Sequence, residues 1–221
     1  MKLKYSVAKE GFPFYGSSAG LALVFIFLKL YWLAIILACF SVFCLFFFRD
    51  PDRIPEGDDH CFVSPADGKV LGVEKHKTHP LFSEKCVKIS IFMSVFNVHI
   101  NRSPVAGTVT NSQYKPGRFF PAYQDLAAVD NEQNELWIRN GAQVFALTQI
   151  AGILARRIRC YAKVDDVLQR GQKIGLIQFG SRVDLHLPPD FQVSVLPGQK
   201  VLAGKSIIGH FKKENEENGK N

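Results

Sequence analysis

The stretch Ser64–Val70 reads SPADGKV, and a related stretch, SPVAGTV, returns at Ser103–Val109. In both, a serine and a proline lead through a glycine into a β-branched residue, a pattern typical of a turn that feeds a strand. A second, weaker repeat relates Val167–Gly175 to Val201–Gly209 with one gap. Together the two repeats predict hairpins that occur twice within one β-rich unit.

Strand signals continue through the whole region after Cys61. Short apolar or alternating runs, such as VKISIFMSVFNVHI from Val87 and QKIGLIQF from Gln172, are separated by Gly and Pro. Closely spaced short strands favour a mainly β domain, a sandwich or a flattened barrel. The paired hairpins resemble those of lipoyl and biotinyl carrier domains. Residues 148–160 carry a helical rhythm, which predicts one helix there.

An apolar segment precedes the β-rich region. Between Gly11 and Phe48 the one formal charge is Lys29. A bilayer core needs about 20 helical residues, so this run is long for a single span. We expect a helical membrane hairpin over about 15–48 with its tip near Lys29, and one tilted span is the alternative. Positive charge on both flanks favours both ends staying cytoplasmic.

The sequence therefore predicts an N-terminal membrane anchor over 1–53, a β-rich domain over 54–210 and a disordered, charged tail over 211–221. The 221 residues carry a formal net charge of +7. With an apolar anchor present, attraction to an anionic membrane surface explains this excess better than binding to nucleic acid. The five cysteines contain no C-x-x-C pair, which indicates neither a disulfide framework nor a zinc site.

Ser181 follows Gly180 between an apolar run and an alternating one, VDLHL. A turn serine is one interpretation. The G-x-S-x-G elbow of a hydrolase requires a second glycine and a following helix, and this stretch has neither. The serine is expected at the start of a buried strand.

His99 lies in the stretch NVHINR. If the strand continues through it, alternation places His99 between Asn97 and Asn101 on a polar face, with Phe96, Val98 and Ile100 on the core face. A solvated strand histidine and a functional one both fit this pattern.

Asp67 lies in the Pro-Ala-Asp-Gly turn, where a simple turn aspartate is also expected. Taken together, Asp67, His99 and Ser181 supply an orienting carboxylate, a base and a hydroxyl nucleophile. Gly180 has no Cβ, so its carbonyl is sterically open and is a candidate for the carbonyl that Ser181 attacks.

These stretches resemble phosphatidylserine decarboxylases of the short, membrane-anchored prokaryotic type. The resemblance covers nearly the whole chain and rests on the apolar hairpin closed by FFRDP, on SPADGKV, on MSVFNVHINR and on IQFGSRVD. Longer members of the family carry LGST where this chain has FGSR at 179–182. They also carry a second histidine where this chain has Arg102, so the role of His99 is less firmly implied than that of Ser181.

The resemblance implies a pyruvoyl-dependent carboxy-lyase. Ser181 would attack the Gly180 carbonyl, and the chain would separate into a β chain (1–180) and an α chain (181–221). Ser181 would become a pyruvoyl group that forms a Schiff base with the substrate and serves in place of pyridoxal phosphate, with no metal. His99 is implied as the proton donor and as the base in cleavage, with Asp67 as its partner.

The implied reaction converts phosphatidylserine to phosphatidylethanolamine in phospholipid biosynthesis, at the cytoplasmic face of the cell membrane. The α and β chains would form a heterodimer or a higher oligomer. Phe119, Phe120 and Tyr123 could line a lipid-facing mouth or belong to the core. Three alternatives stay open: a non-catalytic membrane-tethered adaptor, a membrane-anchored serine hydrolase, and a decarboxylase of another serine lipid such as archaetidylserine.

Overall fold

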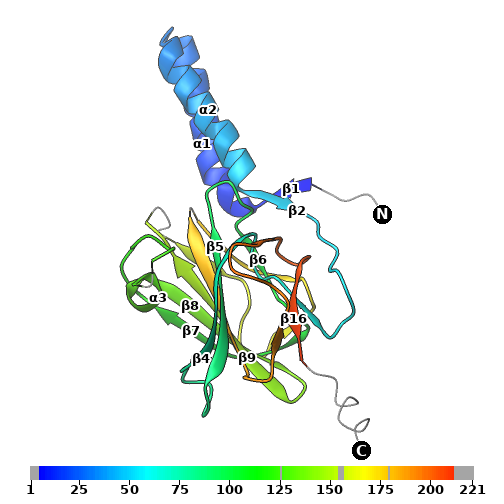
Figure 1. Ribbon diagram of the computed structural model, residues 1–221. Helices are drawn as coiled ribbons and strands as arrows, with labels where there is room; N and C mark the ends of the chain where they lie inside the picture. The colour runs from blue at the N-terminus through cyan, green and yellow to red at the C-terminus, as the bar shows by residue number, and fades with distance from the viewer. Residues whose placement is uncertain (1–4, 125, 154–156, 179, 212–221) are drawn as a thin grey trace, which may run out of the picture. The chain divides into compact units, whose positions relative to one another are not determined.

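The computed structural model describes residues 5–124, 126–153, 157–178 and 180–211. Contacts divide the chain into two units, Met1–Asp52 and Arg53–Asn221. A mainly β unit preceded by a helical hairpin confirms the fold class expected from the sequence (Figure 1). The finer domain limits at 53 and 210 stay predictions, and residues 212–221 of the expected tail lie outside the described residues.

The N-terminal unit is a helical hairpin closed by a strand pair. Helices α1 (Phe12–Phe27) and α2 (Tyr31–Phe47) are joined by a short turn. In that turn Lys29 has a φ of 61°, which confirms the predicted tip. The 3-10 helix η1 (Lys9–Gly11) precedes α1, and strands β1 (Tyr5–Val7) and β2 (Arg49–Pro51) pair at the base.

Small side chains fill the space between the two helices. Ser18, Ala22, Ala34 and Ser41 are buried, and the Ser41 hydroxyl donates to the Tyr15 carbonyl at 2.9 Å. Small residues allow helices to approach closely, as membrane helices do. The stretch Lys9–Phe27 is long and apolar enough to cross a membrane, whereas Tyr31–Phe47 is shorter.

The second unit is built on one curled antiparallel sheet and two small ones. The large sheet has the order β11-β7-β8-β9-β13-β5-β4-β15. Its strands are β11 (Val167–Leu168), β7 (Gly107–Lys115), β8 (Gln133–Asn140), β9 (Gln143–Ala151), β13 (Ser181–Leu187), β5 (Cys86–Met93), β4 (Gly68–Lys77) and β15 (Lys200–Val201). A short helix, α3 (Ala127–Asp130), precedes β8.

The small sheets have the orders β10-β12-β6 and β14-β16-β3. They contain β10 (Ile158–Cys160), β12 (Lys173–Ile177) and β6 (Ile100–Arg102), and β14 (Gln192–Val193), β16 (Ile207–His210) and β3 (Cys61–Val63). The prediction of a helix over 148–160 is wrong, because residues 143–151 form β9 and 158–160 form β10. Strand β9 is buried on both faces from Phe145 onward. Its sequence therefore does not alternate between apolar and polar residues as a half-exposed strand does.

The sequence repeat is also a structural repeat. Ser64 and Ser103 each donate their hydroxyl to the carbonyl two residues on, at 2.7 Å in both cases. The carbonyls of the same serines accept from Gly204 and Gly171 at 2.7 and 2.8 Å. The duplicated hairpins predicted from the sequence are therefore present, with matching hydrogen bonds in both copies.

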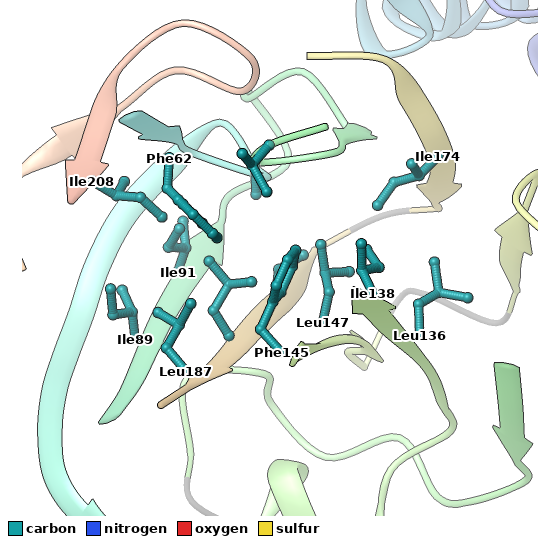
Figure 2. Packing of buried hydrophobic residues seen from close by; sticks show 14 of the residues in the cluster. Phe62, Ile89, Ile91, Leu136, Ile138, Phe145, Leu147, Ile174, Leu187 and Ile208 are labelled. Atoms are coloured by element: carbon teal, nitrogen blue, oxygen red, sulfur yellow. The ribbon is translucent and has the colours of Figure 1, made fainter. Parts of the chain in front are cut away.

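Aliphatic and aromatic side chains from the three sheets form one core. Phe62, Phe145, Leu147 and Ile91 are fully or almost fully buried, and Figure 2 shows them pointing into a common interior. The Phe62 ring meets those of Phe145 and Phe191 edge-on at 5.2 and 5.1 Å. This core holds the inner face of β13, the strand that begins at Ser181.

Candidate active site

Ser181 opens the central strand β13 and is fully buried. It lies opposite Met93 of β5 and Ala151 of β9, so its side chain shares their inner face of the sheet. Its hydroxyl oxygen makes no hydrogen bond within the residues that the structure describes. Buried hydroxyls nearly always make a hydrogen bond. A buried hydroxyl that makes none among the described residues is free to act as a nucleophile.

The carbonyl that precedes Ser181 is held against Gly152. Gly180 has a φ of 58°, in the left-handed region that favours glycine. A Cβ on Gly152 would stand only 3.1 Å from the Gly180 carbonyl carbon and still closer to its oxygen. Because Gly152 has no side chain, the Gly180 carbonyl, which is the candidate scissile carbonyl, lies in the space that a side chain at Gly152 would fill.

His99 is fully buried beside the segment that leads to Ser181. Its Nδ1 lies 3.0 Å from the Asn97 carbonyl oxygen, and that carbonyl can only accept, so the neutral ring carries its proton on Nδ1 and Nε2 is the basic nitrogen. The His99 carbonyl accepts from the Ile177 N–H at 3.3 Å. These contacts place His99 next to the end of β12, four residues before Ser181.

The expected continuous strand through His99 is wrong. Strand β5 ends at Met93, and the Asn97 side chain accepts hydrogen bonds from the N–H and hydroxyl of Ser94 at 2.9 and 2.8 Å. This cap forms a turn that leaves Phe96 outside, whereas Val98 and Ile100 are buried as expected. His99 and Asn101 point inward, and Phe96 is 68% exposed.

Asp67 is buried, and its carboxylate bonds to an arginine and to a backbone N–H. Its two oxygens contact the Arg53 guanidinium at 3.0 Å and the Ala203 N–H at 2.7 Å. The neighbouring Pro65 carbonyl accepts from the Arg102 N–H at 2.9 Å. Asp67 thus fixes the turn that supports strand β6, and a direct role towards His99 stays a prediction.

Arg102 stands at the position of the second histidine of longer family members. Its guanidinium donates to the Gly171 carbonyl at 2.9 Å, and its side chain is buried. At this position the chain therefore holds an arginine that braces the turn before β12.

An apolar pocket of about 400 Å³ opens beside Gly180. Its lining includes Phe92, Tyr123 and Ile153, and Tyr123 and Ile153 are exposed. Of the three aromatic residues expected at a lipid-facing mouth, Tyr123 lines this pocket, whereas Phe119 and Phe120 are not among its lining residues.

The outer face of β13 is anchored by a buried ionic network. Arg182 pairs with Asp184 at 2.6 Å and donates to the Ser90 hydroxyl at 2.9 Å. Lys88 lies 3.3 Å from the second oxygen of Asp184. These bonds hold the strand that follows Ser181. They lie on the outer face of the sheet, opposite to the face that carries the Ser181 hydroxyl.

Further along that outer face, His186 stacks on His79 with ring centroids 4.2 Å apart. Burial, followed by the nearby His79, lowers the pKa of His186 to about 4. Burial by itself would raise the pKa of Glu135, but hydrogen bonds led by the one from His79 lower it to about 2. This cluster belongs to the outer face, away from the Ser181 side chain.

The residues around the junction fit the pyruvoyl group that the resemblance implies. A buried hydroxyl without a hydrogen bond follows a glycine carbonyl, and the space beside Gly180 holds no described atom within 4 Å of an added Cβ. Among the described residues, no group of three or more His, Cys, Asp or Glu side chains could hold a metal ion.

Comparison with known proteins identifies the family. Residues 40–209 match the family model of phosphatidylserine decarboxylase. The phosphatidylserine decarboxylase proenzyme of Syntrophus aciditrophicus is 42% identical over 217 residues, 96% of this chain and 100% of the relative. That of Geotalea uraniireducens is 45% identical over 92% of this chain and 95% of the relative. With its mainly β fold and near end-to-end match, the chain belongs to the phosphatidylserine decarboxylase family.

Proposed function

We propose that this chain decarboxylates phosphatidylserine to phosphatidylethanolamine, using a pyruvoyl group made from its own Ser181. The observation that carries the proposal is the buried Ser181 hydroxyl, which has no hydrogen-bond partner in the described part of the chain and directly follows the Gly180 carbonyl. The relatives' designation as proenzymes supports a processing step.

In the cleavage step, the Ser181 oxygen attacks the Gly180 carbonyl carbon, and the bond from that carbon to the Ser181 nitrogen breaks. An ester forms, and the nitrogen takes up a proton. Loss of the Ser181 Cα proton then expels the Gly180 carboxylate. The dehydroalanine that remains takes up water and releases ammonia. The products are residues 1–180 and a chain of residues 181–221 with a blocked amino end.

His99 is the proposed base for these proton transfers. Its Nδ1 is bonded to the Asn97 carbonyl, which directs the lone pair to Nε2. Asp67 contributes by holding the turn that supports β6, through Arg53 and Ala203. Once formed, the pyruvoyl group would supply an electron sink for the loss of carbon dioxide. His99 is then the proposed donor that returns a proton to the substrate carbon.

The two chains are expected to stay together as a heterodimer after cleavage. Strand β13, the first strand of the α chain, lies between β5 and β9 of the β chain and is paired along both edges. Its alternate residues Val183 and Leu185 belong to the hydrophobic core. Separation would therefore require opening the middle of the sheet.

The helical hairpin is proposed to hold the enzyme at the cytoplasmic face of the cell membrane. A diacyl lipid does not diffuse freely in water, so the domain has to work at the interface. The exposed apolar faces of the helices suit acyl chains, and the positive net charge suits an anionic surface. The apolar pocket beside Gly180 suits loss of a desolvated carboxylate. Another serine lipid, such as archaetidylserine, carries the same headgroup.

The test is the intact mass of the purified chain beside Ser181→Ala. We expect wild type to give two fragments that meet between Gly180 and Ser181, the smaller with a pyruvoyl terminus, and the variant to stay whole. An intact, folded wild-type chain would overturn the proposal. It would favour the adaptor, or the serine hydrolase if a serine-directed phosphonate labels Ser181.

A further inference from the structure

Two amide side chains, Asn101 and Gln149, lie side by side in the interior of the second unit. Both residues are fully buried. Gln149 Nε2 donates to Asn101 Oδ1 at 2.8 Å. Gln149 Oε1 is buried and accepts no hydrogen bond within the described parts of the chain. An unpaired buried carbonyl oxygen is costly, so this pair requires an explanation.

The pair lies on the same interior face of the sheet as Ser181. Gln149 lies on β9 opposite Val183, two residues from the Ala151 that faces Ser181. Residues two apart on a strand share a face, and long side chains reach such diagonal neighbours. Asn101 contacts the sulfur of Met93, the residue opposite Ser181 on β5, at 3.6 Å. Two buried polar atoms without partners among the described residues, Ser181 Oγ and Gln149 Oε1, therefore share one interior face.

The structural repeat shows that the fold itself does not require amides here. In one copy Gly175 of β12 pairs with Asn101, and in the other Gly209 of β16 pairs with Phe62. A Cβ on Gly175 would lie 2.7 Å from the Gln149 amide nitrogen, and one on Gly209 would lie against the Phe191 ring.

The space beside the strand glycine is thus filled by an aromatic ring in one copy and by an amide side chain in the other. Phe62 and Phe191 satisfy the packing with no polar atom. The copy beside Ser181 instead carries a polar pair with an unsatisfied oxygen, which points to a ligand.

The orientation of both amides follows from Met93. A thioether sulfur can accept but not donate, so Asn101 presents its NH₂ group to Met93 and its oxygen to Gln149. Gln149 must then offer its NH₂ group to Asn101. The atom left over is an acceptor, Gln149 Oε1, and its missing partner is a hydrogen-bond donor.

We propose that Gln149 Oε1 binds the primary amine of the lipid headgroup beside residue 181, with Asn101 as the positioning residue that orients it. The assignment rests on the proposed function. The amine is the donor that the serine headgroup must bring to residue 181, and an acceptor there orients its nitrogen lone pair for reaction. The carboxylate of the headgroup has no N–H or O–H group to offer this oxygen at neutral pH.

The test uses processed full-length protein and measures capture of the amine at residue 181, not product formation. Glycerophosphoserine and glycerophosphoethanolamine are each incubated with cyanoborohydride, and the mass gain of the 181–221 chain is followed. Both probes carry the amine, and only the first carries the carboxylate. Gln149→Leu removes the acceptor. Thr148→Val is the matched control, because it removes a buried hydroxyl from the opposite face of the same strand.

We expect Gln149→Leu to cleave normally and to capture both probes about 2- to 10-fold more slowly, the loss expected for one hydrogen bond to an uncharged amine. Thr148→Val is expected to capture both at the wild-type rate. Capture by Gln149→Leu at the wild-type rate would overturn the proposal. Slower capture of the serine probe only would also overturn it, since the contact would then be with the carboxylate.

A folded Gln149→Leu chain that fails to cleave would likewise overturn the assignment, because the amide would then serve Ser181 itself. If Gln149→Leu does not fold, Gln149→Met removes the same acceptor oxygen and keeps an unbranched side chain. Failure of wild type to cleave, by contrast, would contradict the proposed function and not this contact alone.

Discussion

Gly152→Ala tests whether the position of the Gly180 carbonyl controls cleavage. An alanine Cβ would stand 3.1 Å from the carbonyl carbon of Gly180, nearer still to its oxygen, and 3.2 Å from the Ala122 Cβ. To reach an ordinary contact the carbonyl oxygen has to move by about 1 Å, and a misplacement of that size costs about 100-fold in rate. Overpacking at a buried strand end should also cost about 1–3 kcal/mol of folding free energy.

The assay follows the fraction of intact chain with time at 25 °C after synthesis, by gel and by mass. Thermal melting in a Ser181→Ala background measures the stability cost separately from cleavage. Gly72→Ala is the matched control, because a Cβ on that β4 glycine meets no described atom within 4 Å. Hydroxylamine, which cleaves esters, reports whether the ester has formed.

We expect Gly152→Ala to accumulate intact chain that hydroxylamine does not cleave, and Gly72→Ala to process like wild type. If folded Gly152→Ala cleaves as fast as Gly72→Ala, the carbonyl does not need its place against Gly152. The reasoning from that contact would then be wrong.

Three further predictions concern the junction and the two charge clusters. Gly180→Asn should cleave faster than Gly180→Val, because the φ of 58° suits asparagine and disfavours a β-branched residue; equal rates in the same time course would contradict this. Asp67→Asn should cost about 3 kcal/mol in denaturant unfolding, since it removes the negative charge 3.0 Å from the largely buried Arg53 guanidinium. Adding Arg53→Met should recover most of that loss, and a single variant as stable as wild type would exclude the argument. The pKa of His186 is about 4 in the folded chain against 6.5 ordinarily, so the unfolded chain binds a proton that the folded chain does not. Stability should therefore fall, by at most about 3 kcal/mol, as the pH drops from about 6.5 to about 4, and His186→Gln should melt with a flatter pH profile over that window.

The duplicated hairpins could be predicted because their signals are local. Each serine bonds within its own turn, and each following glycine begins a strand, so Ser64 and Ser103 reveal their geometry within a few residues. The apolar hairpin is equally local, because an uninterrupted run and one charged tip at Lys29 are visible without knowledge of any partner.

The interior of the second unit could not be predicted in the same way. Alternation placed Phe96 inside and His99 on a polar face, but the Asn97 cap ends the strand and reverses them. Strand β9 seemed helical in sequence because both of its faces are buried. The importance of Gln149 depends on its register with Val183 and on its contact with Asn101, neither of which one sequence displays.

The interiors of the two copies of the repeat differ in polarity. The copy around Phe62 is filled by aromatic rings, which stabilise the unit without polar cost. The copy around Asn101 carries a buried histidine, and also a hydroxyl and an amide oxygen that find no hydrogen-bond partner among the residues that the structure describes. Unsatisfied groups of this kind persist only where surrounding structure over-determines them. The ionic network on the outer face of β13 and the aromatic copy on the inner side provide that support. Replacing both Asn101 and Gln149 by leucine should therefore raise the stability of an uncleavable Ser181→Ala chain while slowing amine capture in the processed one, and a loss of both would show that the polar copy is needed for folding as well.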